Sequence, residues 1–424
     1  MAENAELMER FKEAFEANDA ASFKKLLERY PEVKARINEP VAAFDAPVIT
    51  RARSREMLDV LIDAGADINA KSRWWAGGFG LLHGAEPDLA EYAIKRGAAV
   101  DVHAAARLGK FEELRRLIGS NPELVHAPGG DGQTPLHFAK TVEIADFLLQ
   151  QGAKIDALDI DHESTPAQYM VRERQGVARF LVERGCRTDL LMAAALGNAD
   201  LVRKHLEADP SRIRMSVSER YFPKRNRRSG GTIYVWTLGQ NKTAHAIARE
   251  FGHEEIVRLL MERSPDELRL AIAGEAGDAE VFKALLQKQP GLIAKLSEED
   301  RRKLVDAAQE NSVAAVELML SGGWPTDTRG QHGGTALHWA AFHGNAKMVA
   351  VILRFHPPLE LEDADFHGTP LGWAIHGSEH GWYCRTGDYA GTAQALLRAG
   401  AKPPKKVEGT EAVKEVIRKF SGKV

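Results

Sequence analysis

The sequence predicts an all-α solenoid that runs through residues 1–424 as a single array of about eleven or twelve helix pairs, with one inserted β-hairpin. One observation is a helix motif that recurs along the chain. It reads GTALHWAAFHGN from Gly334, GQTPLHFAK from Gly132, HGTPLGWAI from His367 and HAAARLGKFEELRRLI from His103. The other is a series of apolar stretches that end at a glycine, namely Gly65, Gly97, Gly152, Gly185 and Gly400. Gly65 and Gly97 are 32 residues apart, and Gly152 and Gly185 are 33 apart, which is the length of one two-helix repeat.

The elements of this array have local causes in the sequence. The glycines mark helix ends, because glycine adopts a left-handed conformation at little cost. Residues 1–37 are predicted to form an amphipathic helix pair that caps the N-terminal end. Residues 410–424, which begin TEAVKEVIRKF, are polar on one face and are predicted to form the C-terminal capping helix. The terminal units of a solenoid need such a polar outer face.

The stretch from Thr335 to Gly344 resembles the first helix of an ankyrin repeat: Thr-Ala-Leu-His, an apolar residue, Ala-Ala, two variable positions and Gly. The resemblance covers nearly all of the chain. The last full unit, GTPLGWAIHGSEHGW…GDYAGTAQALLRAGA, is similar to the end of a set of bacterial ankyrin-repeat proteins. The family implies a right-handed arc of helix pairs with a concave inner face. It also implies that His137 and His338, the fixed histidines of the motif, bond neighbouring backbone, and that Phe342 and His343 lie at the variable positions facing the groove.

Two stretches depart from the regular unit in the first two thirds of the chain. Near Lys71 a loop carries Trp74 and Trp75, which either plug the gap left by a short helix or form a contact patch. Residues 214–240 are longer than an inter-repeat loop, and their runs MSVSERYF and TIYVWTL favour strands. Between these runs lie four positive charges, Lys224, Arg225, Arg227 and Arg228. We therefore expect a β-hairpin whose basic tip either contacts an acidic partner, a phosphate or a nucleic acid or only keeps the edge in solution.

A third departure lies in the last full unit, where SEHGWYCRTG separates two helices that are normally joined by a tight turn. Residues 376–388 are therefore predicted to form a long helix–helix loop. Gly377 and Gly381 indicate that the first helix ends between His376 and His380. Asp388 is expected to be the N-cap of the second helix.

Aromatic and imidazole side chains gather in the last units. Trp339, Phe342, His343, Trp373 and His376 occupy inward or nearly inward positions of two successive units. The long loop adds His380, Trp382 and Tyr383. Because successive units stack at one repeat spacing, we expect these side chains to converge near the C-terminal end of the groove. Aromatic and arginine side chains are frequent anchors in interfaces, so this group is a candidate partner-binding surface together with the four basic residues of the predicted hairpin.

The same cluster raises the alternative of an enzyme. His343, His376 or His380 beside a carboxylate or a tyrosine would be chemically adequate for acid–base catalysis. However, the chain contains no H-E-x-x-H, C-x-x-C, G-x-S-x-G, Walker or G-x-G-x-x-G motif. The sequence therefore predicts no metal site and no cofactor, and an enzyme is the less favoured interpretation.

Composition limits the classes of function. The net charge of −3 does not suit a polyanion-binding protein, and two cysteines suit a reducing compartment. The N-terminal stretch MAENAELMERFKEAFEAND is unlike a signal peptide, and the chain lacks an apolar run of the ~18 residues that a membrane span needs. The sequence thus predicts a cytoplasmic protein, with a monomer favoured, that binds an extended segment or a helix of a protein partner. Catalysis by the histidines and phosphate or nucleic-acid contact through the basic tip are the alternatives.

Overall fold

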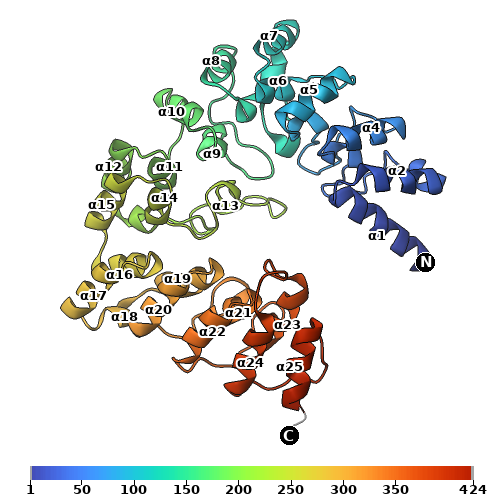
Figure 1. The fold of residues 1–424 in the computed structure, drawn as a ribbon. Coiled ribbons are helices and arrows are strands. Elements are labelled where there is room, and N and C mark those ends of the chain that lie inside the picture. Colours follow the sequence, from blue (N-terminus) through green and yellow to red (C-terminus); the bar gives the residue numbers. More distant parts are fainter. Residues whose placement is uncertain (1, 422–424) are drawn as a thin grey trace. The chain divides into compact units, whose positions relative to one another are not determined.

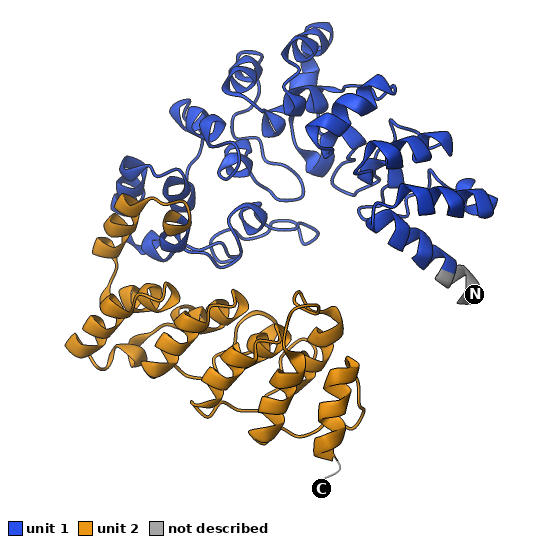
Figure 2. Cartoon of the chain, viewed as in Figure 1, with its two compact units in different colours: residues 1–247 blue, residues 248–424 orange. Residues whose placement is uncertain are grey.

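The computed structural model describes residues 2–421 of the chain. Residue 1 and residues 422–424, the outer ends of the expected capping segments 1–37 and 410–424, lie outside the described residues. The internal contacts divide the chain into two compact units, residues 1–247 and 248–424 (Figure 2). The boundary falls within helix α14 (Ala244–Glu250). That residues 1–424 form one continuous array stays a prediction.

The first unit is built from seven pairs of helical elements (Figure 1). The first members of the pairs are α1 (Ala2–Glu16), η1 (Val48–Arg51), η2 (Leu81–His83), α6 (Val102–Leu108), η5 (Pro135–Phe138), α9 (Pro166–Met170) and α11 (Leu190–Ala195). The second members are α2 (Ala20–Arg29), α4 (Arg55–Asp63), α5 (Pro87–Lys95), α7 (Phe111–Ser120), α8 (Val142–Gln150), α10 (Gln175–Glu183) and α12 (Ala199–Ala208). Like members pack side by side, as α6 does with η2 and η5.

Short helical turns fill the connections of this unit. They are α3 (Pro31–Lys34), η3 (Pro122–His126), η4 (Gly130–Gly132), η6 (Pro210–Arg214) and α13 (Tyr234–Thr237).

The second unit begins within α14, continues through α15 (Glu254–Arg263) and contains four further pairs. The pairs are α16 (Asp266–Glu275) with α17 (Ala279–Lys288), α19 (Glu298–Gln309) with α20 (Val313–Ser321), α21 (Ala336–Phe342) with α22 (Ala346–Leu353), and α23 (Pro370–His380) with α24 (Tyr389–Arg398). Two short turns, α18 (Leu292–Lys295) and η7 (Gln331–Gly333), lie between pairs. Helices α19, α21 and α23 form one layer and α20, α22 and α24 the other, and one apolar core runs from Leu270 to Ile417. Helix α25 (Glu411–Ser421) packs on α24 with Val413 and Ile417 buried.

Within residues 2–421 the secondary structure is helical, which confirms the all-α prediction. The five glycines that were expected to end helices all have positive φ, from +86° at Gly185 to +106° at Gly400. This is the left-handed conformation that glycine adopts most easily. No helix in this part of the chain is long and apolar enough to cross a bilayer.

The predicted β-hairpin at 214–240 is wrong, because residues 2–421 contain no strand and this segment has only one isolated bridge, between Ser216 and Thr243. The two strand-prone runs do not pair with each other. The second run instead forms the helical turn α13, which buries Tyr234 completely and joins its hydroxyl to Asp189 Oδ2 at 2.9 Å. Burial of a large aromatic side chain outweighs a weak strand propensity, and an isolated two-stranded hairpin has little stability of its own.

The expected loop at 376–388 also begins later than predicted. Helix α23 continues through Gly377 to His380, and the backbone N–H of Gly381 closes its last turn on the carbonyl of Gly377 at 2.9 Å. Gly377 serves close packing and does not stop the helix. A Cβ atom at this position would lie 2.5 Å from the backbone carbonyl oxygen of Phe342.

Candidate functional site

The aromatic side chains of α21, α23 and the loop after α23 form one cluster in the second unit. Trp339 and Trp373 are its buried base, with ring centroids 5.2 Å apart and ring planes at 82°. The indole N–H of Trp373 donates to Asp363 Oδ2 at 2.8 Å, which orients this ring. Phe342 packs on both indoles, and its ring centroid lies 5.9 Å from that of each. The cluster thus rests on a rigid base, since two successive first helices hold its rings.

Exposed rings cover this base. Trp382 is 64% exposed, although its ring centroid lies 5.8 Å from that of Trp339 and 5.7 Å from that of Phe342. Tyr383 stands edge-on to the imidazole of His343, with centroids 5.1 Å apart. The rings of the cluster therefore converge as the sequence predicted. Their role in binding stays a prediction.

The structure adds Phe366 at the edge of the cluster. Its side chain is 68% exposed, and its ring lies 5.3 Å from that of His332, which in turn lies 6.4 Å from Trp339. No sequence pattern indicates Phe366, because it lies in an inter-repeat turn, where an aromatic residue has no regular position. We use the name aromatic face for Phe366, Trp339, Phe342, His343, Trp373, His376, Trp382 and Tyr383.

The three histidines of the catalytic alternative have different environments. His343 is buried, and its Nε2 donates to the backbone carbonyl of Gln309 at 2.9 Å. Burial lowers the pKa of His343, so the neutral imidazole is favoured. His376 and His380 are exposed on α23, with ring centroids 4.9 Å apart. The ring of His376 stacks on that of Phe342, with centroids 6.4 Å apart, and His380 contacts His376.

The four basic residues of the insert lie together on an exposed segment, but two of them have partners. Lys224 Nζ lies 3.0 Å from a carboxylate oxygen of Glu219. The guanidinium of Arg228 lies 4.5 Å from the ring centroid of Trp75. Arg225 and Arg227 are exposed, and the carboxylate of Glu163 accepts the backbone N–H of Arg225 at 2.9 Å. The segment is therefore attached to a repeat turn of the first unit and does not project as a separate hairpin.

The fixed histidines act as helix caps in the first and second units alike. His83, His137 and His338 each accept, through Nδ1, the backbone N–H of the residue three positions earlier, at 3.0 to 3.1 Å. With Nδ1 as acceptor, Nε2 carries the proton. It donates to the carbonyl of Ser164 from His137 and to the carbonyl of Gly368 from His338, at 3.2 Å in both cases. These histidines join one repeat to the next.

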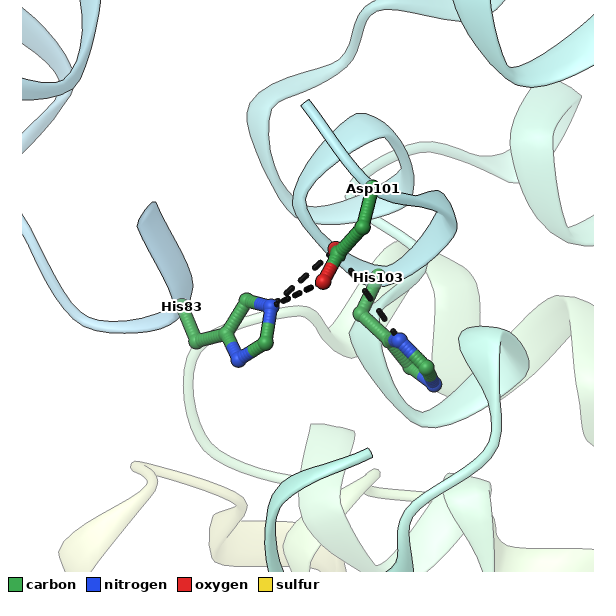
Figure 3. A group of neighbouring side chains, drawn as sticks. All are labelled: His83, Asp101 and His103. Carbon is green, nitrogen blue, oxygen red and sulfur yellow. Dashed lines mark hydrogen bonds and ion pairs between the residues drawn. The ribbon is translucent and has the colours of Figure 1, made fainter. Parts of the chain in front are cut away.

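His83 differs from the other two because its Nε2 donates to a carboxylate, that of Asp101, at 2.9 Å (Figure 3). Asp101 also accepts Lys71 Nζ at 2.8 Å and the backbone N–H of Ala104 at 2.9 Å. Burial opposes ionisation of Asp101, but the imidazole of His83 and these other donors outweigh it and hold its pKa well below the usual range. His103 is the third residue of this group, and its Nε2 donates to the backbone carbonyl of Ala127 at 2.9 Å.

The ligand atoms of His83 and Asp101 are therefore already engaged. His83 uses both nitrogens, and a lysine ammonium neutralises the carboxylate. We interpret the group as a repeat-to-repeat connection.

Stacked helix pairs, glycine stops and Thr-x-x-His caps define a helical-repeat protein. The family model for ankyrin repeats (three copies) matches residues 102–191 and 304–405. These two stretches are therefore ankyrin repeats, and repeats of this kind are generally protein-binding modules. No curated protein shows significant similarity to it.

Proposed function

We propose that this protein binds a segment of a partner protein through the aromatic face of its second unit. The observation that carries the proposal is the exposure of large rings on a buried aromatic base. Trp382 is 64% exposed and packs on Trp339, which is 3% exposed. Phe366 is 68% exposed and is joined to the same indole through the ring of His332. Exposed contiguous apolar groups on a folded protein often mark an interaction site.

The energetics of interfaces support this proposal. Tryptophan is among the residues that contribute most to binding when a partner covers them, and the largest contributions come from rings held in place before binding. The rings beneath Trp382 are already packed, so covering it would require little reordering of the base. The proposal also agrees with the role of ankyrin repeats in general, since the matched residues 304–405 contain every residue of the aromatic face.

The acid–base alternative finds less support in the geometry. His343 has one nitrogen bonded to a backbone carbonyl, and its other nitrogen is buried. The ring contacts of His376 and His380 are with Phe342 and with each other. The basic-segment alternative likewise rests on exposure of Arg225 and Arg227 alone.

A peptide-display experiment with a matched control tests the proposal. The purified full-length chain would be screened against a library of displayed peptides, and the ligands obtained would be measured against Trp382→Ala, Phe366→Ala and Trp236→Ala. Trp236 is the control because it is a 74% exposed tryptophan that belongs to the first unit. We expect the first two variants to weaken binding by about 2 kcal/mol, or about thirtyfold in Kd, and the control to leave it unchanged. Ligands that bind all four proteins equally well would refute the proposal.

A further inference from the structure

A group of two carboxylates and one imidazole lies in the first unit where two successive repeat turns meet. Asp131 belongs to η4, and Asp161 and His162 belong to the corresponding turn of the next repeat. The carbonyl of Asp131 accepts the backbone N–H groups of Ile160 at 2.8 Å and of Asp161 at 3.1 Å, which holds the two turns together. One possible ligand atom from each of the three side chains lies within 4.8 Å of the others.

The imidazole of His162 is oriented by the insert. Its Nδ1 donates to the backbone carbonyl of Gly231 at 2.9 Å, so the lone pair of the neutral ring is on Nε2. This Nε2 lies 3.8 Å from Asp131 Oδ2 and 3.9 Å from Asp161 Oδ2. Both distances are too long for hydrogen bonds. They are close to the spacing of roughly 3.4 Å between two ligands that each lie about 2.1 Å from one tetrahedral ion.

Burial and charge make this arrangement costly without a cation. The side chains of Asp131, Asp161 and His162 are 13%, 8% and 11% exposed. A third carboxylate, that of Asp159, lies behind them and accepts the hydroxyl of Tyr169 at 3.0 Å. Three carboxylates therefore outnumber one imidazole even when the ring is protonated. Among residues 2–421, no lysine forms an ion pair with them as Lys71 does with Asp101.

A buried donor lies at the same place. The indole nitrogen of Trp74 is buried next to the carboxylate of Asp131. The second ring of the pair, Trp75, carries the guanidinium of Arg228. The site is thus enclosed by the tryptophan loop and by the insert, two segments that depart from the regular repeat.

We propose that Asp131, Asp161 and His162 bind a divalent transition-metal cation of the zinc class, and that the cation fastens the insert to the repeat turns. One imidazole with two carboxylates suits zinc, whereas magnesium and calcium prefer sites made of oxygen ligands alone. The carbonyl of Gly231 is the partner that fixes the second nitrogen of a ligating histidine. The sequence motifs did not predict this site because its ligands come from two turns and no single helix.

The cation would stabilise the insert through short connections. The backbone N–H of Gly230 donates to Asp161 Oδ1 at 3.0 Å, and the hydroxyl of Ser229 donates to the backbone carbonyl of Asp161. Both residues directly follow the exposed basic segment 224–228. A loss of order at Asp161 would therefore release this segment, which contains four trypsin sites.

Zinc titration of the full-length chain, freed of metal with a chelator, tests the proposal. We expect about one Zn²⁺ per chain, and a weakening of binding by about a hundredfold or more in Asp131→Asn and in His162→Gln. Asparagine tolerates the left-handed backbone of Asp131, which has a φ of +54°. Glutamine can still donate to Gly231. If circular dichroism shows that Asp131→Asn is unfolded, Asp161→Asn replaces it, because asparagine can still accept the N–H of Gly230.

Trypsin digestion supplies a second readout. We expect Zn²⁺, but not Mg²⁺, to slow cleavage at Lys224, Arg225, Arg227 and Arg228 about tenfold in the unmodified chain and not in Asp131→Asn. His103→Gln, in the group of Figure 3, is the matched control and should keep both the stoichiometry and the protection. Absence of zinc binding, or equal affinity in both ligand variants, would overturn the site. Zinc binding without protection would overturn the link to the insert, and equal protection by Mg²⁺ would overturn the zinc class.

Discussion

Replacement of His338 by glutamine should remove a pH dependence of stability from the second unit. His338 is fully buried, and its neutral ring both accepts the N–H of Thr335 at 3.0 Å and donates to the carbonyl of Gly368 at 3.2 Å. Burial lowers the pKa of His338 to about 4. Protonation would place an N–H on Nδ1 and leave the N–H of Thr335 without its acceptor.

The sign and size of the effect follow from linkage. The unfolded chain takes up a proton at His338 near pH 6.5 and the folded chain only near pH 4, so the unfolded state binds more protons between these values. The free energy of unfolding is therefore unaffected by this group above pH 6.5 and falls as the pH decreases toward 4. At pH 4.5 the loss amounts to about 2.5 kcal/mol for a folded pKa of about 4.

Another repeat of the chain shows that glutamine can replace the fixed histidine. Gln168 occupies the position of the fixed histidine in another repeat, and its Oε1 accepts the N–H of Thr165 at 2.9 Å. His338→Gln can therefore keep the cap without a titrating group. At pH 7.5 we expect it to be about 1 kcal/mol less stable than the unmodified chain, because the bond to Gly368 is weakened. At pH 4.5 it should be about 1.5 kcal/mol more stable, since it avoids the loss described above.

Urea unfolding followed by tryptophan fluorescence at pH 7.5, 6.5, 5.5 and 4.5 measures this reversal. His376→Gln is the control, because His376 is exposed on the same unit and its replacement should leave the pH dependence unchanged. If the unfolding free energies of His338→Gln and of the unmodified chain ran parallel over this pH range, the assignment of the neutral buried imidazole would be wrong.

Two further predictions concern buried polar contacts. Lys303 Nζ lies 2.9 Å from Glu275 with side chains 5% and 15% exposed, so Lys303→Met should lower the unfolding free energy by about 3 kcal/mol, and Glu275→Leu added to it should restore more than half. Urea unfolding of both variants decides this, and a single-variant loss below about 1 kcal/mol would contradict it. Tyr234→Phe removes the 2.9 Å bond to Asp189, whose pKa is raised by burial, and should cost about 2 kcal/mol. Thermal unfolding of the two proteins checks this loss, and equal midpoints would show that the bond does not anchor the insert.

The sequence by itself determined the helix ends at the five glycines and the histidine caps, because these depend on residues close together in the chain. A glycine in the left-handed region or a histidine three positions after a threonine acts within one helix turn, as at Gly65 and at Thr335 with His338. The convergence of Trp339 and Trp373 was predictable for a related reason. Stacking of identical units carries a position in one repeat to the same position in the next.

Only the tertiary structure decided how the irregular segments fold. The strand-prone run around Tyr234 became a helical turn because Asp189, 45 residues away, accepts its hydroxyl inside the core. Gly377 remained inside α23 because the backbone of Phe342 leaves no room for a Cβ. The ligand group of His162 likewise depends on the carbonyl of Gly231, 69 residues later. Such contacts are set by the packing of distant segments, whose energies exceed local propensities and leave no regular spacing in the sequence.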